Sequence, residues 1–238
     1  MSNYLERVQM VLGTDLLDKL ANKKVIVFGC GGVGGACIEA LCRIGILNID
    51  VVDGDTVSLS NKNRQIIALD STIGKPKTSV IKSRMLDINS LVKVEEYNLF
   101  YNEETYNKID LAKYDYVIDC IDTVTSKLHL IEECSLKKIP LICSTGTGNR
   151  MDPTKFKITD IFKTAYDPLA KVLRSELRKR HINKLTVLAS DEAPVKISED
   201  RKIQDPISKR NIPGSMPFVP PVAGYIIASY VVKKLLEV

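Results

Sequence analysis

The chain has 238 residues, a length typical of one large α/β domain or of one domain with a cap. Its hydrophobic content of 45% can support a sizeable core, and its net charge of +5 permits an anionic partner without requiring one. The N-terminus lacks the pattern of a signal peptide, and the last apolar stretch, residues 218–232, is too short for a membrane helix of ~20 residues. We therefore expect a cytoplasmic protein with no membrane partner.

Six cysteines are spread along the chain: Cys30, Cys37, Cys42, Cys120, Cys134 and Cys143. None forms a CxxC pair, so the sequence predicts no structural zinc site. Several lie in apolar segments that we interpret as core strands or helices. This placement is typical of small buried thiols in a reducing compartment.

The first part of the chain alternates two kinds of element. Residues 1–22 predict a polar, helical N-terminal arm, and residues 23–150 predict a nucleotide-binding region. Its strands are expected at residues 25–28, 49–52, 94–97, 116–119 and 141–144. Its helices are expected after a glycine turn at residues 29–35 and over about 77–88 and 125–137. This alternation predicts an α/β fold with a Rossmann-like, mostly parallel, doubly wound sheet and helices on both faces.

Residues 151–238 predict a C-terminal extension of the same domain that includes a basic helix. Asp167 and Pro168 form a helix start, with Asp167 as N-cap and Pro168 at the first helical position. Residues 191–215 lack periodicity and predict a loop. The remaining elements are two strands and a buried C-terminal helix, expected near residues 155–160, 185–189 and 222–236.

The most informative feature is the glycine turn, in which Gly29, Gly31, Gly32 and Gly34 link a buried strand to a helix. Backbone N–H groups in such a loop can approach a phosphate closely, and the helix N-terminus adds positive potential. Asp53 ends the next strand and follows Gly34 at nearly the ~20-residue offset expected for a ribose-binding carboxylate. These elements in this order predict an adenine-nucleotide site.

Two cations and a second carboxylate favour a triphosphate over a dinucleotide. Arg64 and Lys77 can neutralise phosphate charge, and Asp122 can hold Mg²⁺ at the carboxyl edge of the sheet, where ligands of such sheets bind. The alternatives are ordinary surface cations and, for Asp122, an N-cap role in the following helix. We interpret Asp119 as structural and Asp55 as a loop-capping residue. A hydride-transferring dehydrogenase would have less use for this set.

Together these residues carry a resemblance to a known family. The chain resembles the ubiquitin-activating-type adenylyltransferases in the pattern Gly29-x-Gly31-Gly32-x-Gly34, Asp53, Asn61-x-x-Arg64-Gln65, Lys77 and Asp119-x-x-Asp122. The resemblance implies that ATP and Mg²⁺ bind and that AMP is joined to a carboxylate. In the implied site Asp53 holds the ribose, Arg64 and Lys77 bind phosphates, and Asp122 binds Mg²⁺, with Asn61 and Gln65 beside them. In relatives an arginine of the partner's N-terminal arm reaches the phosphates, which implies a homodimer and gives this role to Arg7.

Further motifs narrow the resemblance to one branch, the tRNA threonylcarbamoyladenosine dehydratases. They are Arg7 with Val11-Leu12-Gly13, Gly146-x-Gly148-Asn149-Arg150-x-Asp152-Pro153, Lys163-Thr164-x-x-Asp167-Pro168-Leu169-Ala170 and Gly214-Ser215-x-x-Phe218-Val219-Pro220. The branch is implied to activate the threonine carboxylate as an acyl-adenylate. The neighbouring carbamoyl group then closes a ring and expels AMP, a route that needs no catalytic cysteine. Some members carry a C-terminal cysteine linked to sulfur transfer; no cysteine follows Cys143 here, which speaks against a sulfur-transfer partner.

The implied tRNA substrate suggests a role for the basic residues on the helix that begins at Pro168. On the helix that begins at Pro168, an apolar stripe of Leu169, Val172, Leu173 and Leu177 is expected to be buried. The opposite face carries Lys171, Arg174 and Arg178, with Lys179 and Arg180 nearby. A solvated helix face is the plain alternative, and phosphate contact is favoured because of the tRNA substrate.

Other functions remain open at this stage. An adenylyltransferase acting on the C-terminal carboxylate of a small sulfur-carrier protein would share the nucleotide site. A nucleotide-binding scaffold without catalysis would not need the magnesium ligand. The basic helix and the missing zinc cysteine pairs favour the tRNA enzyme.

Overall fold

The computed structural model describes residues 4–204 and 211–238. Within them one sheet has the strand order β3-β2-β1-β4-β5-β7-β6. The strands are β1 Lys24–Phe28, β2 Asn48–Val52, β3 Glu96–Tyr97, β4 Tyr116–Asp119, β5 Leu141–Ser144, β6 Phe156–Asp160 and β7 Thr186–Ser190. From β3 to β7 in this order, neighbouring strands pair in parallel, and β6 closes the edge antiparallel to β7.

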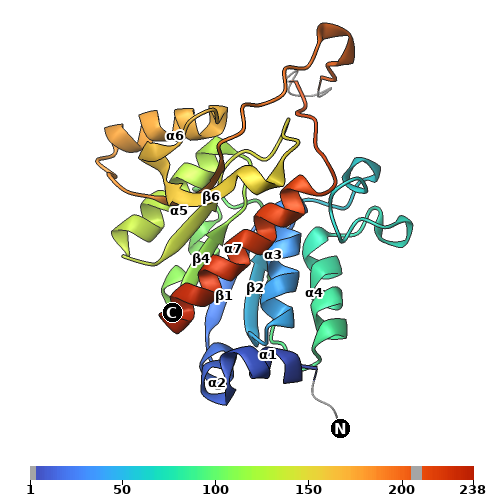
Figure 1. The fold of residues 1–238 in the computed structure, drawn as a ribbon, viewed down its shortest axis with the longest axis vertical. Helices are drawn as coiled ribbons and strands as arrows, with labels where there is room; N and C mark the ends of the chain where they lie inside the picture. The colour runs from blue at the N-terminus through green and yellow to red at the C-terminus, as the bar shows by residue number, and fades with distance from the viewer. Residues whose placement is uncertain (1–3, 205–210) are drawn as a thin grey trace.

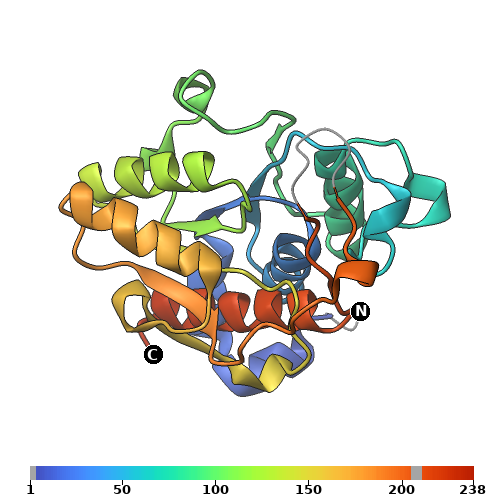
Figure 2. The same ribbon diagram turned by 90° about the horizontal axis from the view of Figure 1, so that it is seen from above.

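Helices cover both faces of this sheet (Figures 1 and 2). They are α1 Glu6–Leu12, α2 Thr14–Ala21, α3 Gly32–Arg43, α4 Lys77–Ile88, α5 Val124–Leu136, α6 Pro168–Lys179 and α7 Val219–Leu236. Helices α3, α4 and α7 share one apolar core with strands β1 and β2, whereas α5 and α6 build the cores of the other face. The expected α/β, mostly parallel, doubly wound architecture is confirmed.

Helix α7 lies directly against α3 (Figure 1). A Cβ at Gly224 would come within 2.2 Å of the Val33 carbonyl oxygen, so only glycine allows this approach of the two backbones. By length and composition alone α7 could cross a membrane, yet in this fold its apolar side chains pack into the core. It begins earlier than expected, because Pro220 and Pro221 occupy its first turn, where their missing N–H groups leave no helical bond unmade.

Most predicted elements appear at or near their expected positions. The strands at 116–119 and 141–144 and the helix at 77–88 have the predicted bounds. The strand expected at 94–97 is shorter, because only Glu96 and Tyr97 pair with β2. The expected loop 191–215 contains a short turn, Glu199–Arg201, and a bridge between Gln204 and Asn211; its residues 205–210 lie outside the described part.

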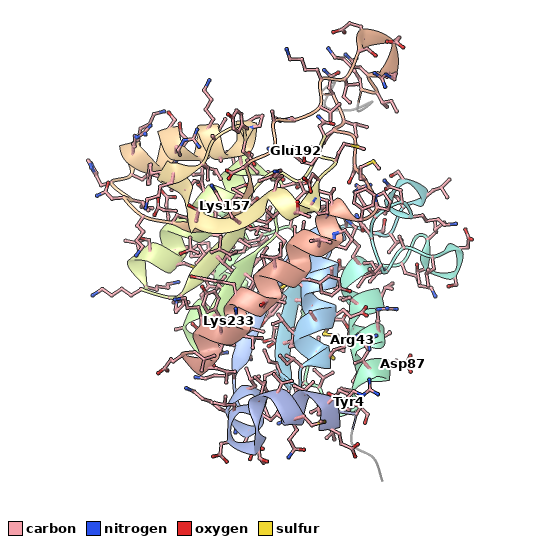
Figure 3. All side chains as sticks on the ribbon, viewed as in Figure 1. Tyr4, Arg43, Asp87, Lys157, Glu192 and Lys233 are labelled. Atoms are coloured by element: carbon pink, nitrogen blue, oxygen red, sulfur yellow. The ribbon has the colours of Figure 1, made fainter. Side chains whose placement is uncertain are left out.

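The N-terminal helices lie at one end of the molecule, and the carboxyl ends of the parallel strands lie toward the other. Figure 3 shows Tyr4, which precedes α1, near one end, and Glu192, which follows β7, toward the other. Arg43, the last residue of α3, lies toward the same end as Tyr4. Since α3 begins at Gly32, the start of this helix and the carboxyl ends of the parallel strands lie toward the end marked by Glu192.

Candidate active site

The predicted nucleotide residues meet in one cleft at the carboxyl edge of β1, β2 and β4. The cleft has a volume of about 410 Å³. It is lined by eight of the predicted residues, Gly29, Gly31, Gly32, Asp53, Arg64, Gln65, Lys77 and Asp122, together with Asp55, Tyr101, Ser126, Thr147 and others. Gly34, Asn61 and Arg7 are not among its lining residues.

The glycine turn is shaped by two close approaches. Gly29 has φ +92°, and a Cβ there would lie 2.7 Å from the Cys120 carbonyl oxygen. A Cβ at Gly34 would lie 1.7 Å from the Gly29 carbonyl oxygen. Glycine at this position therefore allows the chain to turn tightly, although Gly34 does not line the cleft. Gly31 is the N-cap of α3, so the first N–H groups of this helix lie at the cleft without a capping side chain. A helix start of this kind binds anions.

Asp53 is tied to the glycine turn. Its Oδ2 accepts a hydrogen bond from the Cys30 N–H at 2.7 Å, and its Oδ1 accepts one from the Asp55 N–H at 2.8 Å. Burial raises the pKa of Asp53, and nearby Lys77 and these two N–H donors partly oppose the rise. The carboxylate is thus fixed beside the phosphate-binding turn, where it can accept a hydrogen bond from a ribose hydroxyl.

Lys77 opens α4 and is held by a carboxylate for which the sequence predicted another role. Its Nζ lies 2.6 Å from Asp55 Oδ2, and its side chain is only 7% exposed. The expectation that Asp55 caps a loop is therefore wrong: its side chain lines the cleft and orients the lysine. A buried ammonium on a carboxylate is a preorganised charge for a phosphate.

The segment around Arg64 supplies a second cation and an unpaired acceptor. Arg64 Nη1 donates to the Ser60 carbonyl oxygen at 3.0 Å and to Asn63 Oδ1 at 2.8 Å. Asn61 is buried and shapes the turn, because its Oδ1 accepts the Ser58 N–H at 3.1 Å. Gln65 Oε1 is buried and finds no hydrogen-bond partner in the described parts of the chain. Such an orphaned acceptor at the cleft fits a donor group of a ligand.

The two carboxylates at the end of β4 have different environments. Asp119 Oδ2 lies 2.7 Å from Lys127 Nζ with both side chains fully buried, and Lys127 also donates to the Ser144 carbonyl oxygen at 3.0 Å. Asp122 is exposed, and its Oδ1 accepts a 3.4 Å hydrogen bond from the Thr123 hydroxyl. Thr123, not Asp122, is the N-cap of α5, so the N-cap alternative for Asp122 is excluded. No group of three or more His, Cys, Asp or Glu residues suited to a metal occurs among residues 4–204 and 211–238.

Arg7 lies far from the cleft of its own chain. Helices α1 and α2 sit at the opposite end of the sheet (Figure 1). Leu5, next to α1, packs against Gly45 ahead of β2, where a Cβ at Gly45 would come within 3.0 Å of Leu5 Cδ1. The exposed face of α1 carries Met10 and Val11, which are 86% and 82% exposed.

Helix α6 differs in part from its predicted faces. Ala170, Leu173 and Leu177 are buried, but Val172, expected in the stripe, is 45% exposed. Arg174 does not point freely outward: its guanidinium donates to the Thr164 carbonyl oxygen at 3.1 Å and to the Thr164 hydroxyl.

Three of the other predicted cations of α6 and its end also have partners. Arg178 lies over the Phe162 ring, 5.4 Å from its centre. Lys179 and Arg180 both pair with Glu176, and Arg180 also pairs with Glu132 at 2.6 Å. Lys171 and Arg178 therefore remain as exposed cations of this helix without a carboxylate partner among the described residues.

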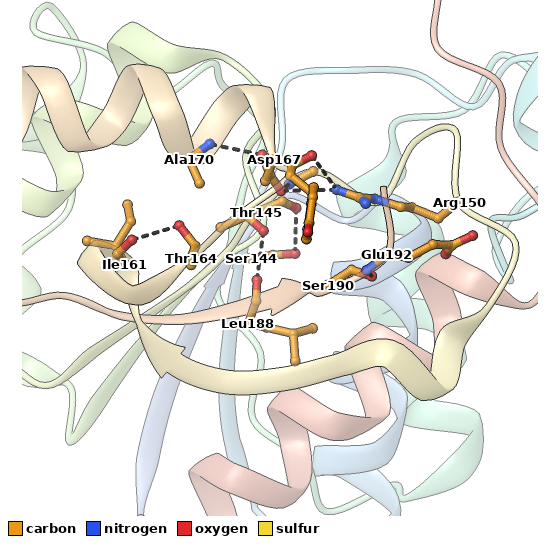
Figure 4. Close-up of polar contacts among 12 residues, drawn as sticks. Ser144, Thr145, Arg150, Ile161, Thr164, Asp167, Ala170, Leu188, Ser190 and Glu192 are labelled. Atoms are coloured by element: carbon orange, nitrogen blue, oxygen red, sulfur yellow. Dashed lines mark hydrogen bonds and ion pairs between the residues drawn. The ribbon is translucent and has the colours of Figure 1, made fainter. Parts of the chain in front are cut away.

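The sequence interpretation missed a buried polar cluster around Asp167 and Arg150 (Figure 4). The loop that contains Arg150 also contains Thr147, which lines the cleft. Asp167 accepts the Ala170 N–H at 2.9 Å, as its predicted N-cap role requires, and also the Gly146 N–H at 2.9 Å. Arg150 is 2% exposed, and its Nη2 donates to the Tyr166 carbonyl oxygen at 3.2 Å. Burial lowers the pKa of Arg150, opposed by Asp167 and Glu192. The motif containing Arg150 was visible in the sequence, but nothing local revealed that the side chain is buried.

The fold and the cleft define a nucleotide-binding protein in which two cations and three carboxylates line the same cleft as the glycine turn. A model described as "ThiF family" matches residues 4–238, so the chain belongs to the ThiF family. A tRNA threonylcarbamoyladenosine dehydratase of Bacillus subtilis is 44% identical over 244 aligned positions, which cover 100% of this chain and 96% of that protein. The resemblance to this branch is thereby confirmed.

Solved structures agree with the sequence comparison. The Escherichia coli tRNA N6-threonylcarbamoyladenosine dehydratase TcdA in complex with AMP has a TM-score of 0.88 and 32% identity, covering 97% of this chain and 93% of that one. Its complex with ATP has a TM-score of 0.86. A molybdopterin-synthase adenylyltransferase of Haemophilus influenzae is 35% identical, but over only 57% of this chain and 54% of that protein.

Proposed function

We propose that this chain uses ATP to dehydrate threonylcarbamoyladenosine in tRNA. The observation that carries the proposal is the convergence of Asp53, Arg64, Lys77 and Asp122 on one cleft, in a chain whose full length matches a dehydratase of that name. A free carboxylate is a poor electrophile, and adenylation supplies the leaving group that ring closure needs.

Different residues of the cleft contact different parts of ATP during adenylation. The N–H groups at the start of α3 and the cations Arg64 and Lys77 stabilise the phosphates, while Asp53 accepts a hydrogen bond from the ribose. A threonine carboxylate oxygen attacks the α-phosphorus, and pyrophosphate leaves with the electron pair of the broken bond. The carbamoyl group of the same nucleoside then attacks the activated carbonyl carbon. AMP departs with one oxygen of the former carboxylate, and the carbamoyl group loses a proton to solvent. Counted from the free acid, the nucleoside therefore loses one water in total.

Asp122 is the residue that would hold Mg²⁺. Its carboxylate is exposed at the cleft and has no cation partner in the described ranges, and Mg²⁺ is often bound by one or two carboxylates together with substrate phosphates. When bound, the ion neutralises phosphate charge. Beyond Asp122 the ligands would be phosphate oxygens and water, which agrees with the lack of a larger carboxylate group in the described parts of the chain.

A symmetric homodimer would complete the site. Arg7 cannot serve the cleft of its own chain, because α1 lies at the other edge of the sheet. The exposed Met10 and Val11 on the same helix give α1 an apolar face for a partner. In a two-fold dimer the arm of each chain would lie against the other chain and bring Arg7 to its phosphates.

The tRNA surface would include α6. Lys171 and Arg178 are its outward cations, with Lys179, Arg180 and the inward-bonded Arg174 adding positive potential around them. We place the reaction in the cytoplasm, without a membrane partner.

The proposal is tested by AMP release from labelled ATP. The protein with ATP·Mg²⁺ should release AMP when tRNA bearing threonylcarbamoyladenosine is added, and not with tRNA that lacks this group. AMP release with a small sulfur-carrier protein instead, and none with modified tRNA, would favour the alternative adenylyltransferase.

A further inference from the structure

The segment that connects β7 to α7 leaves and re-enters the fold beside the cleft. The parts of this segment that the structure describes extend beyond the carboxyl edge of the sheet (Figure 1). We define residues 191–204 as its outgoing limb and residues 211–218 as its return limb. Close to the fold, both limbs are bonded to a loop that follows β5.

Asn149 of that loop binds both limbs at once. Its carbonyl oxygen accepts the Val195 N–H at 2.8 Å, on the outgoing limb. Its own N–H donates to the Gly214 carbonyl oxygen at 2.8 Å, and its Oδ1 accepts the Gly214 N–H at 2.6 Å. Asn149 has φ 56°, a conformation that Asn adopts more readily than most residues. The return limb is thus held by a two-bond clip from a single residue.

The clip lies next to the cleft. Thr147 of the same loop lines the cleft. A Cβ at Gly148 would lie 2.7 Å from Pro213 Cβ, so the loop and the return limb pack without room for a side chain. One residue beyond Gly214, the return limb contacts Asn63, the neighbour of Arg64, which lines the cleft.

That second contact leads directly to Arg64. The Ser215 carbonyl oxygen accepts a hydrogen bond from Asn63 Nδ2 at 2.9 Å. Asn63 Oδ1 in turn accepts the hydrogen bond from Arg64 Nη1 at 2.8 Å. Three residues, Ser215, Asn63 and Arg64, therefore form one chain of hydrogen bonds from the return limb to the cation of the cleft.

We propose that the return limb positions Arg64 for the phosphates of ATP, with Asn149 and Asn63 as positioning residues. The hydrogen bonds from Asn149 fix Gly214 and thereby the position of the Ser215 carbonyl group. That carbonyl group orients the Asn63 side-chain amide, which accepts the hydrogen bond from Arg64. The inference rests on the proposed role of Arg64 in binding ATP.

The test measures the Kd of ATP·Mg²⁺ for the full-length protein by calorimetric titration. Asn149→Gly removes the side-chain half of the clip and keeps the positive φ without strain. Asn63→Ala removes both the donor to Ser215 and the acceptor of Arg64 without adding a charge. Each should weaken ATP binding by about 3- to 10-fold, the effect of a hydrogen bond worth roughly 1 kcal/mol. Ser198→Ala is the matched control, because it removes a bond to Arg201 on the outgoing limb and should leave the Kd unchanged.

A double-mutant cycle with Arg64→Ala separates positioning from general structural damage. In the Arg64→Ala background Asn149→Gly should have no further effect on the Kd, because the group it positions is absent. An equal loss with and without Arg64, or no loss in either variant, would overturn the positioning role. If Arg64→Ala itself left ATP binding unchanged, Arg64 would have no role in binding ATP. The proposed function would then lose this residue, and the positioning role of the return limb would be overturned.

Discussion

Asp119 and Asp122 show how position decides the role of a carboxylate. Asp119 is fully buried, and its charge is neutralised by Lys127 and steadied by the Ile121 N–H at 2.9 Å. A buried pair of this kind holds β4, β5 and α5 in place, and removing one partner would leave an uncompensated charge. Asp122 is exposed at the cleft. Its charge is therefore available to a ligand.

Asp122→Asn should lower the rate of AMP formation by ~10² or more, the scale on which a preorganised electrostatic group acts. The melting temperature should stay the same, because the bond between Asp122 and its exposed neighbour Thr123 is weak. Single-turnover AMP release at saturating ATP measures the rate. Asp70→Asn is the control, since Asp70 is an exposed carboxylate paired with Lys62. Turnover near that of the parent chain would remove Asp122 from the site.

At this scale the sequence predicted the residues that belong to local patterns. Asp53, Arg64, Lys77, Asp122 and three glycines of the turn occur in or near recognisable motifs, and all of them line the cleft. The pairing of Lys77 with Asp55 joins two segments distant in sequence. The burial of Lys127 and Arg150 depends in the same way on how strands and loops pack, so each looks like an ordinary charged residue in the sequence.

At the scale of elements, Glu39 joins α3 to α4. Its side chain is 9% exposed and accepts hydrogen bonds from Arg43 at 2.8 Å and from Arg84 of α4 at 2.5 Å. Burial raises the pKa of Glu39, but the two arginines outweigh this effect and leave the pKa below its ordinary value of 4.5. The bonds therefore stabilise the fold in the ionised form.

Glu39→Gln should lower the free energy of unfolding by about 2 kcal/mol at pH 7, the order of a hydrogen bond to a charged group. Because the folded-state pKa is lowered, this contribution is complete above the ordinary pKa and disappears as the pH falls through the folded value. Urea unfolding at pH 7 and at pH 3 should therefore show a difference between the two chains that shrinks at low pH. A difference that stayed constant would assign the loss to packing. Glu133→Gln, in a more exposed pair with Lys137, should change stability by well under 1 kcal/mol.

Helix α6 has one buried apolar face. On its other face, some of the cations are bonded to neighbouring residues. Replacing Lys171 and Arg178 by alanine should flatten the log–log dependence of tRNA affinity on salt by about one unit for each phosphate that is no longer neutralised. The Kd of ATP should not change, because neither residue lines the cleft. The double variant Lys93→Ala, Lys234→Ala is the charge-matched control. Both lysines are exposed near the amino edge of the sheet, Lys93 beside the first residue of β2 and Lys234 beside the start of β4. An unchanged salt slope in the α6 variant would show that tRNA binds elsewhere.

For the whole molecule, the distance between α1 and the cleft makes a shared site testable. Arg7→Ala and Asp122→Asn should each be inactive alone. Mixed and allowed to exchange subunits, they should regain some activity, because a heterodimer contains one cleft with an intact Asp122 and the partner's intact arm. No recovery, with each chain sedimenting as a monomer, would contradict the shared site.

Most of the fold could be predicted from the spacing of apolar residues along the sequence, but the short length of strand β3 and the limbs beside the cleft could not. The alternation of apolar runs and helical patterns predicted six of the seven described strands closely and predicted that the sheet is mostly parallel, but it did not predict the strand order. The short β3 and the limbs beside the cleft depend on contacts between distant segments, such as Asn149 with Gly214 and Asn63 with Ser215. No local pattern contains these contacts.

One measurement tests the proposed substrate and the proposed reaction together. tRNA that carries threonylcarbamoyladenosine is incubated with the protein and ATP·Mg²⁺, digested to nucleosides under mild conditions, and analysed by mass spectrometry. We expect a product lighter than threonylcarbamoyladenosine by one water, formed only when ATP is present. An unchanged nucleoside in the presence of protein that binds ATP would contradict the proposed function.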